Sequence, residues 1–234
     1  MKALLYKEFK LAMHPICYIF IALFPLMVLI PDGGYPKGVA FIYLFTCYPV
    51  LFLGANKGQQ SNDLLYSTLL PIRKKDIVLA RIMTVAIMQF AFMAIMSALS
   101  PLAILIQSFI TVEDTSLGGE AAKALAPVGL GINAFPLLLA IAIIGFSIAD
   151  LIFFPIYYKN GKSIVMSTLF TIFGFVFYIA IFTIVVPYII GIERCNSIPL
   201  WIQFVALAGS LIIYALLHLF VYKISSKRLE RVDF

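Results

Sequence analysis

The sequence contains few charged residues, and this scarcity decides its class. Asp, Glu, Lys and Arg make up 12% of the 234 residues, about half of the ~25% found in soluble domains. Apolar residues reach 63%, more than a soluble fold of this length can place in its interior. Lipid is the natural surrounding for the excess, so the composition predicts a membrane protein.

Cysteine and histidine are also rare. The three cysteines, Cys17, Cys47 and Cys195, are dispersed and odd in number, which argues against a disulfide framework and a metal site. The sequence has no paired-histidine metalloprotease motif and no Gly-x-Ser-x-Gly context. Gly161 to Ser163 resemble the end of a P-loop, but Ile156 occupies the first glycine position. We therefore expect no catalysis and no cofactor in this chain.

Six apolar stretches are long enough to cross a bilayer, which takes ~20 residues each. They cover residues 12–31, 38–56, 78–110, 127–156, 163–191 and 198–222. The sequence thus predicts an all-α polytopic membrane protein, a single transmembrane domain over 1–234 with a tail at 223–234. Nearly every stretch holds a proline, which tends to kink a helix: Pro25, Pro49, Pro101, Pro136, Pro155 and Pro187.

Lysine and arginine are distributed unevenly between the predicted loops, and this bias sets the orientation. With the N-terminus inside, the outer segments hold only Lys37, Lys123 and Arg194 of the 17 basic residues. The inner segments hold Lys2, Lys7, Lys10, Lys57, Arg73, Lys74, Lys75, Arg81, Lys159, Lys162, Lys223, Lys227, Arg228 and Arg231. We predict a multi-pass protein of the plasma membrane with both termini cytoplasmic. The net charge of +6 is then a topology signal and does not indicate nucleic acid.

The inner segment between the second and third stretches has its own pattern. Asn62 or Asp63 is a good helix N-cap, and Pro71 disfavours helix at the residue before it. A short helix in between would have an apolar surface made of Leu65, Tyr66 and Leu69. The basic residues that follow, Arg73, Lys74 and Lys75, would face lipid headgroups or an acidic partner. An ordinary positive-inside loop explains the same residues equally well.

The stretch from Asn62 to Arg81 resembles the cytoplasmic signature of ABC-2 type transporter permeases, and Pro155 to Lys162 resembles the turn before their fifth span. Small bacterial peptide-exporter permeases, including those for phenol-soluble-modulin-like toxins, are the most similar subgroup. The resemblance covers the whole chain. It implies a type-2 ABC exporter-like fold and a coupling helix at residues 61–71 that contacts an ATPase. The residues assigned to that contact are Asn62, Asp63, Leu65, Tyr66, Leu69, Pro71, Arg73, Lys74 and Lys75.

The resemblance also implies partners and cargo. Two ABC ATPase subunits, which bind ATP and magnesium, would work with two permeases, either identical copies or paralogues. The cargo would be an amphipathic peptide or another hydrophobic molecule leaving the cell. Two alternatives stay open: a permease that exports drugs or lipids, and a non-transporting immunity or scaffold protein in the membrane. An intramembrane enzyme would need clustered acids or histidines at one depth, and the sequence offers a single acid there.

That acid is Asp150, nine residues before Lys159 and so ~13 Å from the inner boundary along a helix. An intramembrane ionisable residue is a candidate functional site, although pairing with a nearby basic residue or an inner vestibule explains it as well. His218 is expected in the inner interface. Other polar residues in the spans are expected to bridge helices: Gln89, Ser97, Ser100, Gln107, Asn133 and Gln203.

The first eleven residues are expected to form an interfacial helix. On a helical wheel Leu5, Phe9 and Ala12 share one side, and Lys7 and Lys10 lie roughly opposite. A basic flank of the first span would give the same pattern. The resemblance would make this segment a connecting helix near the ATPase.

Overall fold

A computed structural model describes residues 2–12, 71–113, 135–160, 164–181 and 197–231, with the single positions 26, 185 and 189. The predicted spans at 12–31 and 38–56 fall almost entirely outside these ranges. So does the predicted coupling helix, apart from its last residue, Pro71. The fold is therefore described for the N-terminal segment and for the later helices of the chain.

The secondary structure of the described residues is helical, without strands. The elements are α1 (Lys2–Lys7), the π-helical η1 (Glu8–Ala12), α5 (Lys74–Glu113), α7 (Phe135–Asn160), α8 (Ile164–Ala180) and α11 (Leu200–Glu230). Three helical stretches are long and apolar enough to cross a membrane: Lys74–Leu99, Pro136–Lys159 and Leu200–Glu230. A shorter apolar stretch, Met166–Tyr178, lies in α8. An all-helical membrane protein, as the composition predicts, agrees with these helices.

Local sequence explains several helix limits. Pro136 lies in the first turn of α7, where its missing N–H costs no hydrogen bond. Pro199 precedes α11, and its carbonyl accepts the backbone N–H groups of Ile202 and Gln203. At the start of α5 the N–H of Asp76 donates to the Arg73 carbonyl at 2.9 Å, and the Asp76 carboxylate in this first turn suits the positive end of the helix dipole.

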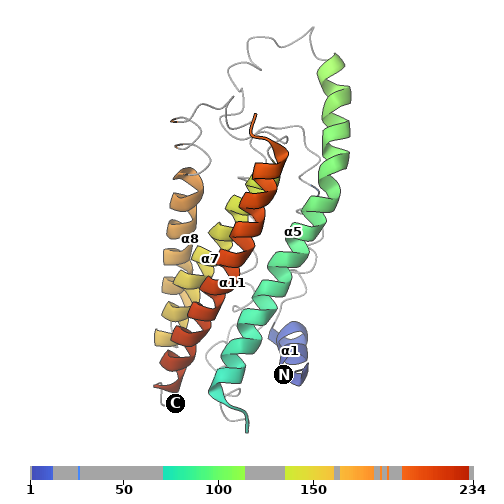
Figure 1. Cartoon of the computed structure of the whole chain (residues 1–234). Helices are drawn as coiled ribbons and strands as arrows, with labels where there is room; N and C mark the ends of the chain where they lie inside the picture. Colours follow the sequence, from blue (N-terminus) through green and yellow to red (C-terminus); the bar gives the residue numbers. More distant parts are fainter. Residues whose placement is uncertain are drawn as a thin grey trace.

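The interior prolines do not end their helices. Pro101 lies inside α5 and Pro155 inside α7. Figure 1 shows a change of direction in the upper half of α5, the half that contains Pro101. A proline ring removes one backbone hydrogen bond and bends the helix in this way.

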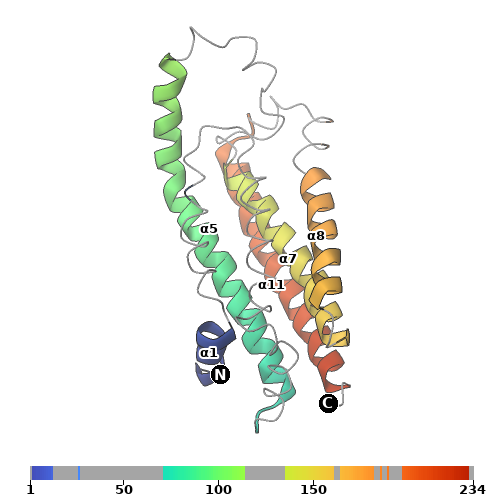
Figure 2. The ribbon, with the colours of Figure 1, turned by 180° about the vertical axis from the view of Figure 1, so that it is seen from behind.

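The long helices lie side by side in the order α8, α7, α11, α5 (Figures 1 and 2). α7 packs extensively against α11 on one side and α8 on the other, while α5 mainly contacts α11. α1 lies against the lower part of α5, and the start of α5 and the C-terminus are at the same end (Figure 1). We call this the basic end, because it carries every lysine and arginine that the structure describes.

Small and polar residues form the face of α11 that packs on its neighbours. Its buried residues recur at intervals of four or seven for most of the helix: Gln203, Ser210, Tyr214, Val221, Ser225, Ser226 and Leu229. Small side chains let membrane helices approach closely. The opposite side exposes large apolar residues such as Trp201, Phe204 and Leu216, which suits contact with lipid.

Two glycines make the contact between α7 and α8 close. A methyl group added at Gly145 of α7 would lie 2.9 Å from the Phe175 ring of α8. One added at Gly174 of α8 would lie 2.5 Å from Ile152 of α7. Each helix thus has a glycine where the other inserts a large side chain, and no residue with a β-carbon fits either position without displacing its neighbour.

Candidate functional site: a buried polar network across three helices

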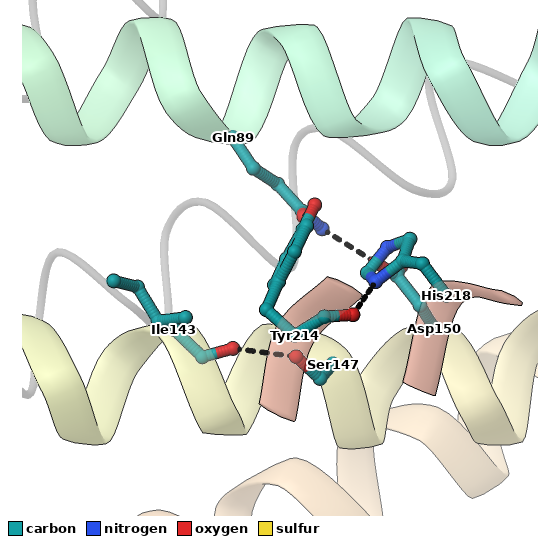
Figure 3. Close-up of polar contacts among 6 residues, drawn as sticks. All are labelled: Gln89, Ile143, Ser147, Asp150, Tyr214 and His218. Atoms are coloured by element: carbon teal, nitrogen blue, oxygen red, sulfur yellow. Dashed lines mark hydrogen bonds and ion pairs between the residues drawn. The ribbon is translucent and has the colours of Figure 1, made fainter. Parts of the chain in front are cut away.

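A group of polar side chains lies between α5, α7 and α11 (Figure 3). Its members are Gln89 of α5, Asp150 of α7, and Tyr214 and His218 of α11. Asp150 and Gln89 are fully buried, and Tyr214 is nearly so. We call these four residues the polar network. Ionisable side chains inside a membrane bundle are expensive to bury, so their grouping at one point is unlike the apolar packing around it.

The hydrogen bonds of the polar network converge on one oxygen of Asp150. Its Oδ2 lies 2.8 Å from Nε2 of His218 and accepts the Nε2–H of Gln89 at 3.0 Å. The Tyr214 hydroxyl donates to Oε1 of Gln89 at 2.6 Å. Nδ1 of His218 lies 2.9 Å from the backbone carbonyl of Tyr214. Each hydrogen bond between two helices also fixes the position of one helix along the axis of the other.

The spacing of residues along each helix places the network side chains on the helix faces that meet. Tyr214 and His218 are four apart on α11, so they lie one above the other on a single face, and their rings stack at 3.9 Å between centroids. Ser147, one turn before Asp150 on α7, donates to the carbonyl of Ile143 in its own helix at 2.9 Å (Figure 3). Ser147 therefore borders the network, while Asp150 makes its contacts across helices.

The other oxygen of Asp150 stands apart from these bonds. Oδ1 is buried and has no hydrogen-bond partner among the residues that the structure describes. A buried carboxylate oxygen without a partner is unusual, because most buried polar atoms in folded proteins are hydrogen-bonded. Asp150 thus holds two partners on one oxygen and none on the other.

A second buried acid–base pair lies toward the basic end. Nε of Arg81, on α5, donates to Oε2 of Glu8 at 3.2 Å, and its Nη1 donates to the hydroxyl of Tyr157 on α7 at 2.9 Å. Both charged side chains are almost completely buried. This pair anchors the N-terminal segment to α5 and, through Tyr157, to α7.

Two further contacts tie helix ends together at the basic end. Lys75, at the start of α5, pairs with Glu230 at the end of α11 at 3.3 Å, with both side chains about half exposed. Arg228 of α11 donates to the backbone carbonyl of Pro155 on α7. The start of α5 is thereby connected to the end of α11, which is in turn connected to α7.

No family model, curated protein or solved structure matches the chain.

The structure places only part of the sequence-predicted site. Asn62, Asp63, Leu65, Tyr66 and Leu69 lie outside the described residues. The described remainder lies directly before α5 or in its first turn: Pro71, Arg73 and Lys75 are exposed and Lys74 is half-buried. These residues are on the surface of the basic end.

The structure gives Asp150 a basic partner, because Nε2 of His218 lies 2.8 Å from its Oδ2. The sequence predicted His218 in the inner interface and left pairing with a basic residue as one explanation of Asp150. Gln89 bridges α5 to both α7 and α11. Ser97 and Gln203 have bonds to carbonyls on or just before their own helices, and the side chains of Ser100, Gln107 and Asn133 are outside the described part.

The buried pair of Glu8 and Arg81 was missed by sequence reasoning. The helical wheel grouped Leu5, Phe9 and Ala12 as one apolar side. Phe9 packs partly buried against the core, and the buried side chains among residues 2–10 are Leu4 and Glu8. A signal existed: Glu8 is the single acid among the first eleven residues. Among the described residues no three His, Cys, Asp or Glu side chains are grouped to hold a metal.

Proposed function

We propose that the chain is the membrane permease subunit of an ATP-driven exporter, working with a separate ATPase. The family resemblance of residues 62–81 and 155–162 suggests this role, with six spans and both termini in the cytoplasm. In this proposal the basic end faces the cytoplasm, as the distribution of Lys and Arg favours. Amphipathic peptides are the proposed cargo, and a second permease copy or a paralogue completes the export path.

The observation that carries the proposal is the way the start of α5 is connected. The exposed residues Pro71, Arg73 and Lys75 lie at the point where the proposed coupling segment, residues 61–71, enters α5. From there Lys75 contacts Glu230 at the end of α11, and Arg81 contacts Glu8 and, on α7, Tyr157. A displacement of this segment would therefore reach three helices and the N-terminal segment.

These contacts suggest how work would pass into the bilayer. Closure of two ATPase subunits around ATP would move the coupling segment and, with it, the first turns of α5. The buried pair of Arg81 and Glu8 would resist separation more strongly than the exposed pair of Lys75 and Glu230, because water and salt screen an exposed pair. The helices would then tilt as connected units.

Site-specific crosslinking tests the ATPase contact. The native cysteines are replaced, and a photoactivatable crosslinker is attached to a single cysteine at Tyr66 or at the exposed Arg73. The matched control is a cysteine at Trp201, which is exposed at the start of α11, the opposite end of the bundle. We expect adducts with a nucleotide-binding subunit from Tyr66→Cys and Arg73→Cys and none from Trp201→Cys. Folded protein that gives no adduct at either cytoplasmic site would reject the assignment.

A second measurement separates an exporter from a scaffold. The co-purified complex is reconstituted into proteoliposomes, and ATP hydrolysis is followed with and without amphipathic peptides. An exporter responds to its cargo with faster hydrolysis, whereas an immunity or scaffold protein leaves the rate unchanged.

A further inference from the structure

The hydrogen-bond roles in the polar network locate one proton. A backbone carbonyl only accepts, so Nδ1 of His218, 2.9 Å from the Tyr214 carbonyl, carries a hydrogen. The opposite nitrogen, Nε2, lies 2.8 Å from Oδ2 of Asp150. If Nε2 and Oδ2 were both unprotonated, two lone pairs would face each other at this distance. The contact therefore requires one proton between the imidazole and the carboxylate.

That proton belongs to the pair and to no other group. It resides on Nε2 as an imidazolium–carboxylate pair or on Oδ2 as a neutral imidazole–carboxylic acid pair, and both arrangements have zero net charge. Removing it would leave a net negative charge in a fully buried position, which is costly inside a membrane bundle. Loss of this proton would therefore leave one buried negative charge between α7 and α11 and weaken their attraction here.

The surroundings favour a proton over a larger ligand. The polar network holds only two metal-ligating side chains, Asp150 and His218, and no group of three occurs among the described residues. Among the described residues, the groups that face Asp150 are Gln89 from α5 and Tyr214 and His218 from α11. Of these only His218 and Tyr214 can titrate, and Gln89 is neutral. Oδ1 has no hydrogen-bond partner within the described part of the chain, so a proton or a proton-carrying water can arrive there.

We propose that Asp150 and His218 form a proton-binding site within the membrane bundle, and that the bound proton holds α7, α11 and α5 together. Gln89 is a positioning residue, because its amide fixes Oδ2 while Tyr214 holds the other end of that amide. Loss of the proton separates the helices at this point and exposes the site. The site does not depend on the proposed ATPase partner, so the failure of either proposal leaves the other standing.

Histidine-selective NMR tests the proton directly. The chain has two histidines, so His14→Gln leaves His218 as the single source of signal in protein labelled with ¹⁵N-histidine. In proteoliposomes, between about pH 5 and about pH 9, a range that brackets ordinary histidine titration, we expect Nδ1 to stay protonated and Nε2 to change state in one transition. A Nε2 signal that is constant over the whole range would overturn the proposal, and this measurement needs no substitution within the network.

The variant Asp150→Asn tests whether the carboxylate shares the proton. Because an amide cannot bind it, we expect the His218 transition to move by a unit or more of pH, on the order of the shifts that a neighbouring charge causes. An unmoved transition would overturn the pairing. Tyr214→Phe serves as the control, since it removes only the hydroxyl that orients Gln89 and should retain the transition.

Thiol accessibility tests the coupling to helix packing. In the cysteine-free background, Ser147→Cys introduces a thiol beside Asp150, and Ser167→Cys introduces an equally buried one on α8. We expect labelling at Ser147→Cys, relative to Ser167→Cys, to rise several-fold across the His218 transition, and the rise to vanish with Asp150→Asn. A constant ratio in folded protein would overturn the claim that the proton holds the helices together.

Discussion

Two buried acid–base pairs connect the helices of this protein, and they differ in what can happen to their charges. Arginine stays protonated in proteins, so Arg81, which contacts Glu8 at 3.2 Å, keeps its positive charge. Histidine exchanges its proton near neutral pH, so the pair of His218 and Asp150, at 2.8 Å, can change its charge. Similar geometry therefore gives a permanent link in one place and a reversible link in another.

The two pairs also differ in position and support. The Arg81–Glu8 pair lies near the basic end and joins the N-terminal segment to α5, with Tyr157 as its neutral partner. The Asp150–His218 pair lies further along α7, inside a network that includes Gln89 and Tyr214. A fixed link near the basic end and a reversible link deeper in the bundle would allow the inner packing to change while the N-terminal segment stays attached.

The largest effect is expected at the fixed link. Arg81→Met leaves the Glu8 carboxylate buried without its charge partner, and we expect a loss of about 3–5 kcal/mol in unfolding free energy. Unfolding in mixed micelles with increasing SDS measures it. The double variant Glu8→Leu with Arg81→Met should recover most of the loss, since an apolar pair of similar volume leaves no charge unpaired. A double variant as unstable as the single one would contradict this account.

The reversible link should be less sensitive. Asp150→Leu removes the acceptor of Gln89 and the partner of His218, and we expect it to cost about 1–3 kcal/mol by leaving buried donors unsatisfied. Asp150→Asn offers an amide of nearly the same shape and should leave assembly intact, as size-exclusion chromatography and the same SDS titration would show. If expression collapsed with Asn, Asp150 would belong with the fixed links.

A smaller effect is expected from Tyr214→Phe. The change deletes one neutral hydrogen bond, from the Tyr214 hydroxyl to Gln89, and keeps the ring that stacks on His218. We expect a loss of about 1 kcal/mol in the same unfolding assay. A loss as large as that of Asp150→Leu would mean that Gln89 depends on Tyr214 more than a single neutral bond implies.

The smallest effect is expected from Lys75→Met. Lys75 and Glu230 form an ion pair with about half of each side chain exposed, and such pairs contribute roughly 0–1 kcal/mol. The variant should therefore unfold within that margin of the parent protein, and added salt should reduce the difference further. Equal losses of unfolding free energy from Lys75→Met and Arg81→Met would show that burial does not cause the difference between the two ion pairs.

The sequence predicted the existence of α5, α7 and α11 because each contains a long apolar run. It predicted a sixth span over 198–222 and a tail from residue 223, and α11 continues through the first part of that tail to Glu230. Charged residues marked the limit in the sequence, yet Lys, Arg and Glu favour helices, and here they extend α11 through the basic end. Hydropathy therefore locates the apolar part of a helix and can miss its continuation.

The polar network was only partly predictable. Asp150 stood out as an acid inside an apolar run, and Gln89 as a polar residue in a span. Their pairing with His218 depends on the axial position of α7 relative to α11. The periodicity of residues within one helix carries no information about that relative position. The pairing of Glu8 was hidden for a related reason. Its partner Arg81 lies 73 residues away on α5, and the pattern within one short segment does not show which helix packs against it.

The bond from Arg228 to Pro155 has a consequence for how this protein can evolve. Its acceptor is a main-chain carbonyl, which every amino acid at position 155 would supply. Substitutions at 155 and 228 should therefore accumulate independently in descendants of this chain, and only loss of the arginine would abolish the bond. Positions 8 and 81 depend on both side chains, so a change at one should select for a compensating change at the other.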